Sequence, residues 1–156
     1  MKRWHIVLMI IGSIAIVVNF IISPVALMLG GAFSEIATGT NAEIEIDSYR
    51  LCKDKNGEDV IIIKYLLRNE GSRPTCLRYE GEFLVYQNGV SLTEYYEELP
   101  KESGYDTEDQ YKNVKGGVEY LAEIAYSLDH TDADVVVEVK DYGFFGTTKE
   151  KTFQIK

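Results

Sequence analysis

The sequence predicts an all-β domain of antiparallel strands that is preceded by one transmembrane helix. The chain has 156 residues, which suits a single globular domain. From Ala42 onward, apolar residues tend to recur at every second position, as they do in β-strands. The first 33 residues contain a long apolar run and no Asp or Glu. We therefore divide the chain into an N-terminal membrane anchor or signal segment (1–33), a small polar linker (34–42) and a β-domain (43–156).

The N-terminal segment has the length of a membrane-spanning helix. Residues 6–22 are almost wholly apolar, and after Pro24 the apolar run resumes and continues to Leu29. A bilayer core needs about 20 apolar helical residues, whereas the apolar region of a cleavable signal peptide usually has roughly 7–15. We therefore expect residues 6–29 to remain as a membrane anchor. Lys2 and Arg3 then place the N-terminus in the cytoplasm and the β-domain outside the cell.

Cleavage of this segment is the alternative. Gly30, Gly31 and Ala32 are small residues of the kind that signal peptidase accepts. Cleavage near Ala32 would release the β-domain as a secreted, soluble factor.

Seven segments of the β-domain have strand character. The second is continuously apolar at its centre, which predicts a central strand that is buried on both faces. Asn88-Gly89 separates two short apolar runs and predicts a tight hairpin turn. The segments are residues 43–52, 58–69, 76–87, 90–93, 118–128, 134–142 and 147–155.

The spacing of these segments indicates the architecture. Short strands separated by turns every 8–12 residues, roughly, are typical of a sandwich or a barrel. The domain is close in size to an immunoglobulin-like antiparallel β-sandwich, which we take as the fold class. Residues 92–114 interrupt the pattern, and we expect a long irregular connection there with a helical turn near residues 94–99.

The two cysteines, Cys52 and Cys76, are expected to stay unpaired. If the first three strands run up, down and up, these residues lie at opposite ends of the sandwich. Strands of about 9 residues would separate them by about 30 Å, whereas a disulfide needs Cα atoms within about 7 Å.

The charge of the chain excludes one class of partner. Residues 34–156 hold all 25 acidic residues and 14 of the 16 lysines and arginines, which leaves a formal charge of −11. A surface this acidic repels nucleic acid, so we expect no nucleic-acid partner. Solubility is the simplest role of the charge, and a basic partner or a cation is the alternative.

Four stretches carry a resemblance to a known family. They are KYLLRNEG (64–71), FLVYQNGVSL (83–92), VKGGVEYLAEIAYSL (114–128) and VVVEVKD (135–141). Together they resemble the domain-of-unknown-function family numbered 5067, which occurs in exported proteins and lipoproteins of Gram-positive bacteria. The resemblance implies an exported domain with an immunoglobulin-like fold related to telokin-like extracellular domains, and it implies no activity. This chain departs from many relatives, because it lacks their lipidated cysteine after the signal peptide.

No catalytic constellation is recognisable. The chain has no GxSxG elbow, HExxH motif or P-loop, and His130 stands in a polar turn. Asp129, Asp132 and Asp134 are weak candidates for a cation site, because the loop lacks the glycine of a calcium loop. We therefore expect neither an enzyme nor a cofactor, and we keep a metal-dependent hydrolase as a less favoured alternative.

The tyrosines of the acidic connection are the stronger functional signal. The chain has 11 tyrosines, and tyrosine is enriched at protein interfaces. The alternative role for some of them is to fold back over the open edge of the core. We interpret the connection as the binding surface for an unknown protein or cell-surface partner, with these candidate residues: Tyr95, Tyr96, Tyr105, Tyr111, Glu97 and Glu98.

Overall fold

The computed structural model of the chain describes residues 41–142 and 146–155. The expected membrane anchor at residues 6–29 lies outside these residues, and so does most of the expected linker. In the described part of the chain, no helix has both the length and the apolar character needed to cross a membrane.

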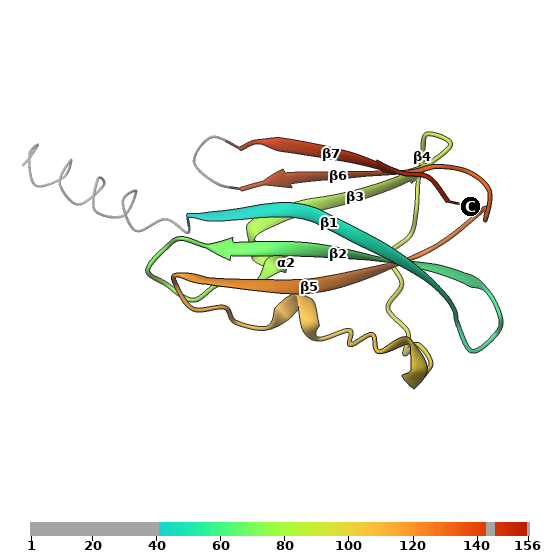
Figure 1. The fold of residues 1–156 in the computed structure, drawn as a ribbon, viewed down its shortest axis with the longest axis horizontal. Helices are drawn as coiled ribbons and strands as arrows, with labels where there is room; N and C mark the ends of the chain where they lie inside the picture. Colours follow the sequence, from blue (N-terminus) through green and yellow to red (C-terminus); the bar gives the residue numbers. More distant parts are fainter. Residues whose placement is uncertain (1–40, 143–145, 156) are drawn as a thin grey trace, which may run out of the picture. The chain divides into compact units, whose positions relative to one another are not determined.

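Seven strands form two antiparallel sheets, which confirms the all-β prediction (Figure 1). One sheet has the order β1-β2-β5 and the other β4-β3-β6-β7. The three-stranded sheet consists of β1 (Ala42–Lys53), β2 (Asp59–Asn69) and β5 (Val118–Ser127). The four-stranded sheet consists of β3 (Gly81–Gln87), β4 (Val90–Ser91), β6 (Val135–Asp141) and β7 (Thr148–Phe153). Three short helices complete the part of the chain that the structure describes: α2 (Leu77–Glu80), η1 (Lys101–Ser103) and η2 (Asp109–Tyr111).

The central strand β2 is buried on both faces, as its apolar sequence predicts. It pairs with β1 on one side and with β5 on the other. Ile61, Ile63 and Tyr65 point into the main core between the sheets. Val60 and Ile62 point the opposite way and belong to a second, smaller apolar cluster.

Alternating residues of both sheets fill the main core. On β6, Val135, Val137 and Val139 are buried, whereas the residues between them are more exposed. The rings of Tyr65 and Phe83 meet edge to face across the core, with centroids 4.9 Å apart. Burial of these alternating side chains from two sheets is the main stabilising contribution to a sandwich.

The hairpin predicted at Asn88-Gly89 is present. Both residues have positive φ, 52° and 77°, as the favoured two-residue turns require. The turn joins β3 to the two-residue strand β4.

Side chains close one lateral edge of the sandwich, where β1 and β7 face each other. A register shift between Ile46 and Ser48 interrupts the pairing of β1 with β2. At this position the Lys151 ammonium donates to the carbonyl oxygens of Ile46, at 3.1 Å, and Asp47, at 2.6 Å. The Tyr49 hydroxyl donates to the carbonyl oxygen of Gln154 at 2.9 Å.

Two local expectations are wrong. Residues 77–80 form the helix α2 and not the start of a strand, because Leu77 is buried and the side chains of Thr75 and Glu80 are joined by a hydrogen bond. The helical turns of the connection lie at residues 101–103 and 109–111, not near residues 94–99. The expectation of unpaired cysteines is confirmed, since Cys52 and Cys76 are both free thiols.

Candidate functional site

The connection between β4 and β5 lies against the three-stranded sheet. It begins as an extension of that sheet, because the Tyr95 amide donates to the carbonyl of Ala125 at 2.8 Å and the Ser127 amide donates to the carbonyl of Thr93 at 2.9 Å. Beyond this point it forms η1 and η2 and returns to β5 (Figure 1). We call residues 92–114 the connection from here on.

Two of the candidate tyrosines face the sheet. Tyr95 and Tyr105 pack on the small apolar cluster that includes Ile62, Leu99 and Ala125. The Tyr105 hydroxyl accepts a hydrogen bond from the Ala125 amide at 3.3 Å, and burial raises the pKa of this tyrosine to about 12. These two rings therefore hold the connection in place, which is the alternative role considered from the sequence.

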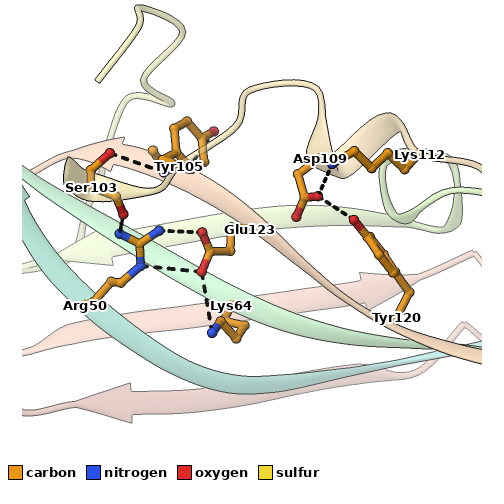
Figure 2. Close-up of polar contacts among 9 residues, drawn as sticks. Arg50, Lys64, Ser103, Tyr105, Asp109, Lys112, Tyr120 and Glu123 are labelled. Carbon is orange, nitrogen blue, oxygen red and sulfur yellow. Dashed lines mark hydrogen bonds and ion pairs between the residues drawn. The ribbon is translucent and has the colours of Figure 1, made fainter. Parts of the chain in front are cut away.

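A charged group ties the connection to all three strands of the sheet (Figure 2). The Arg50 Nη2 atom on β1 lies 2.6 Å from Glu123 Oε2 on β5, and Lys64 Nζ on β2 lies 3.6 Å from Glu123 Oε1. Arg50 also donates through Nη1 to the carbonyl oxygen of Ser103 in η1. Because a guanidinium carries several fixed donors, one arginine can hold both the carboxylate and the backbone of the connection.

A second group holds η2 (Figure 2). Lys112 Nζ lies 2.8 Å from Asp109 Oδ1 and 3.1 Å from Asp106 Oδ2, and the Tyr120 hydroxyl donates to Asp109. The pKa of Lys112 is raised mainly by its hydrogen bond to Asp109 and, to a smaller extent, by its hydrogen bond to Asp106. Lys112 therefore offsets one of the two negative charges of Asp106 and Asp109.

The outward side of the connection is acidic and carries two exposed tyrosines. Tyr96 is 67% exposed and Tyr111 is 42% exposed. Glu97 and Glu98 are also exposed, and the one ion pair of Glu97 within the described residues is with the exposed Lys55, at 3.2 Å. With seven acidic and two basic residues, the connection has a formal charge of −5. The structure thus divides the six candidate residues into two that face the sheet and four that face solvent.

A half-buried ion pair lies where the connection meets α2. Arg78 Nη2 is 2.8 Å from Glu94 Oε2, and the two side chains are 28% and 12% exposed. Burial lowers the pKa of Arg78, but the Glu94 carboxylate raises it by more, so the net shift is upward. The second carboxylate oxygen of Glu94 and the buried hydroxyls of Tyr65 and Tyr126 have no hydrogen-bond partner among the described residues.

Sequence reasoning did not find this ion pair or the neighbouring Tyr79, which is 72% exposed. Both Arg78 and Tyr79 belong to the helix α2, whereas the sequence pattern predicts a strand at these residues. No local signal marks a four-residue helix whose position depends on contacts with distant residues.

The polar turn after β5 does not assemble a metal site. Asp129, Asp132 and Asp134 are exposed. Within residues 41–142 and 146–155, no three His, Cys, Asp or Glu side chains gather closely enough to hold a metal ion. The turn is instead held by Gln87, whose amide donates to the carbonyls of His130 and Ala133 at 2.8 and 2.9 Å.

An open groove of about 430 Å³ lies between the end of β1 and η1. Its lining residues are Arg50, Leu51, Cys52, Lys53, Pro100, Glu102 and Ser103. Burial raises the pKa of the Cys52 thiol, so this cysteine is not an activated nucleophile. The groove therefore offers no recognisable catalytic set.

The fold and the surface define a β-sandwich domain whose most distinctive exposed feature is the tyrosine-bearing, acidic connection. The chain belongs to the family described as a domain of unknown function, DUF5067, whose family model matches residues 32–141. This match confirms the resemblance seen in the sequence.

The chain is similar to several solved structures, of which two are described. One is the archaellum periplasmic stator protein FlaG from Sulfolobus acidocaldarius, with 12% identity and a TM-score of 0.40 over 72% of this chain and 99% of that chain. The other is a protein from Archaeoglobus fulgidus, with 15% identity and a TM-score of 0.38 over 73% of this chain and 98% of that chain. We base no functional argument on similarities of this size. No curated protein matches the chain.

Proposed function

We propose that the chain is a membrane-anchored, extracytoplasmic binding module. Residues 6–29 would hold it in the membrane, and Lys2 and Arg3 would keep its N-terminus in the cytoplasm. The β-domain would then present its connection to a protein or cell-surface partner. Secretion after cleavage near Ala32 is the second candidate, because small residues precede that position.

The division of the connection into two sides carries the proposal. Tyr95 and Tyr105 are used to attach the connection to the sheet, whereas Tyr96 and Tyr111 are left in solvent among carboxylates. A segment that is fixed in this way presents large side chains in a preformed arrangement, so little conformational entropy is lost on binding.

The strand order supports an immunoglobulin-like sandwich. The first, second and fifth strands share one sheet, and the third, fourth, sixth and seventh share the other. Immunoglobulin-like domains place their A, B and E strands against C, F and G in the same way, and those of the variable type add a further strand next to C. Domains of this architecture commonly serve as recognition modules outside the cell, which fits a non-enzymatic role without a cofactor.

Attachment and orientation are tested with the full chain in a Gram-positive host. We expect an uncleaved species in the membrane fraction, identified by its intact mass, and we expect protease added outside intact cells to degrade the β-domain. A species in the medium that starts after Ala32 would show that the protein is cleaved and secreted, and would contradict the membrane-anchored form.

The binding surface is tested by placing a photoreactive phenylalanine analogue at Tyr96 in intact cells. We expect a covalent adduct of defined mass that is lost in the Glu97→Gln, Glu98→Gln double variant. The matched control places the same analogue at Tyr86, on the outer face of β3. Equal adducts from both positions, or none from Tyr96, would contradict the proposed surface.

A further inference from the structure

Three exposed tyrosines are carried by segments that lie against each other. Tyr79 on α2, Tyr96 on the connection and Tyr111 on η2 are 72%, 67% and 42% exposed. We call these three residues the tyrosine patch. The helices α2 and η2 are in contact, and an antiparallel bridge between Thr75 and Val114 joins the backbones that flank them, with hydrogen bonds of 3.0 and 2.6 Å.

The ion pair between Arg78 and Glu94 joins the third segment to the other two. Arg78 precedes Tyr79 on α2, and Glu94 lies two residues before Tyr96 on the connection. Because residues 93–95 pair with β5 as a strand, Glu94 and Tyr96 point to the same side. The 2.8 Å contact between Arg78 and Glu94 therefore brings together the two segments that carry Tyr79 and Tyr96.

Charge indicates what kind of partner the tyrosine patch fits. Glu98 and Glu108 are exposed on the same connection and form no ion pair with any described residue. The connection as a whole has a formal charge of −5 and residues 34–156 one of −11. An arginine guanidinium can stack on a tyrosine ring and pair with a carboxylate at the same time.

We propose that the tyrosine patch binds a cationic polypeptide segment, whose arginine side chains stack on the tyrosine rings and pair with the neighbouring glutamates. This inference rests on the proposed function, since it names the chemistry of the partner for the same surface. It adds Tyr79 to the surface, a residue that the sequence pattern did not single out.

The test measures binding of synthetic peptides to the purified full chain in detergent micelles by isothermal titration calorimetry. The probe is a peptide of alternating arginine and glycine, and its counterparts replace arginine with lysine, glutamate or serine. We expect the arginine peptide to bind best, the lysine peptide more weakly, and the other two not at all. Binding should weaken as salt is added, because the carboxylates are exposed.

Variants locate the binding on the surface. Tyr96→Ala and Tyr111→Ala should each weaken binding of the arginine peptide about threefold to tenfold, and Tyr79→Ala should have an effect of the same size. Tyr96→Phe should keep most of the affinity, because the ring is retained. Tyr86→Ala is the matched tyrosine control and Glu150→Gln on β7 is the matched charge control. Circular dichroism and thermal unfolding check that every variant is folded.

Three outcomes would overturn the inference. Equal binding of the arginine and lysine peptides by all variants would show non-specific attraction to negative charge. No binding of any peptide would reject a cationic polypeptide as the partner. Self-association of the chain that Tyr96→Ala abolishes would assign the patch to a second copy. If no peptide binds but the analogue at Tyr96 still forms a site-specific adduct in cells, the proposed function stands without this inference. If the otherwise unchanged chain forms no adduct from Tyr96, both are rejected.

Discussion

The two sheets differ in what lies on their outer faces. On the three-stranded sheet, Ile62 of β2 is fully buried beneath the connection. On the four-stranded sheet, the corresponding outward residues of β6, such as Val136 and Glu138, are only partly buried. The difference is visible in the sequences of the two strands, because β2 is apolar at consecutive positions and β6 alternates from Val137 onward.

This difference explains how an acidic segment of more than twenty residues keeps a defined path. Leu99, Tyr95 and Tyr105 bury apolar surface against Val60 and Ile62, and this burial favours the attached state. Without this apolar outer face, little would oppose the mutual repulsion of the carboxylates of the connection. The covered face therefore determines the shape of the proposed binding surface.

Among the substitutions that test this difference between the sheets, replacing Ile62 by alanine should change the stability of the domain most. We expect Ile62→Ala to lower the free energy of unfolding by about 2–5 kcal/mol, because it leaves a cavity between the sheet and the connection. Val136→Ala, on the outer face of the other sheet, should lower it by less than about 1 kcal/mol. Chemical denaturation measures both values, and equal losses would show that the connection does not bury the outer face of β2.

The next largest change in stability is expected at the tyrosines that face the sheet, and not at those that face solvent. Tyr105→Ala should destabilise the domain by about 1–3 kcal/mol, since its ring packs on the small apolar cluster. Tyr96→Ala should change the stability by no more than about 0.5 kcal/mol, since Tyr96 is exposed. Thermal and urea unfolding of the two variants, side by side, provide the comparison. A stable Tyr105→Ala variant would argue that the ring is free to serve a partner.

Removing the guanidinium of Arg50 should loosen one part of the connection only. Arg50→Ala should lower the free energy of unfolding by about 1–2 kcal/mol, because Lys64 is then the one cation left near Glu123 among the described residues and the Ser103 carbonyl loses a donor. Hydrogen exchange should speed up around η1 and stay unchanged in β6. Arg50→Lys should restore little, since an ammonium cannot reach both partners in the same geometry. Uniformly faster exchange across both sheets would contradict a local role.

The smallest expected effect is a pH dependence of stability that comes from Asp54, which helps to hold the connection through Tyr95. Asp54 accepts hydrogen bonds from the amides of Asn56 and Glu58 and from the Tyr95 hydroxyl. Burial raises the pKa of Asp54, but these hydrogen bonds lower it by more, so it lies below the ordinary value of 3.8. The carboxylate therefore contributes stability above pH 3.8, and this contribution is lost as the pH falls through the lower, folded-state pKa.

Comparing the wild type with Asp54→Asn isolates this contribution. The variant should be slightly less stable at neutral pH, and the difference should shrink as the pH falls below 3.8. Urea unfolding across this pH range measures the difference. A gap that stays constant at all pH values would show that the ionisation of Asp54 is not what stabilises the turn.

The parts of the fold with strong local signals could be predicted from the sequence. The apolar run of β2 indicates burial on both faces, and Asn88-Gly89 indicates its turn. The helix α2 could not be predicted, because the bridge between Thr75 and Val114 connects residues far apart in the chain. Local propensity says little where such tertiary contacts decide the conformation.

The candidate surface could be predicted only in outline. Composition identifies a connection rich in tyrosine and glutamate, but it does not say which way each ring points. Tyr95 and Tyr96 are adjacent and point to opposite sides, because the backbone there pairs with β5 as a strand. That pairing depends on Ala125 and Ser127, about thirty residues away, so no local pattern could reveal it.

The contact of Lys151 with β1 hinders the association of copies of this chain through their strand edges. Exposed strand edges invite other chains to add a strand, and natural proteins obstruct such edges with bulges and lysines. Lys151 of β7 occupies the carbonyl oxygens of Ile46 and Asp47 at the irregular point of β1. A strand from another chain would have to displace the Lys151 ammonium and pair with β1 across the register shift between Ile46 and Ser48. The side chain of Lys151 thus hinders the addition of another strand at the edge of β1.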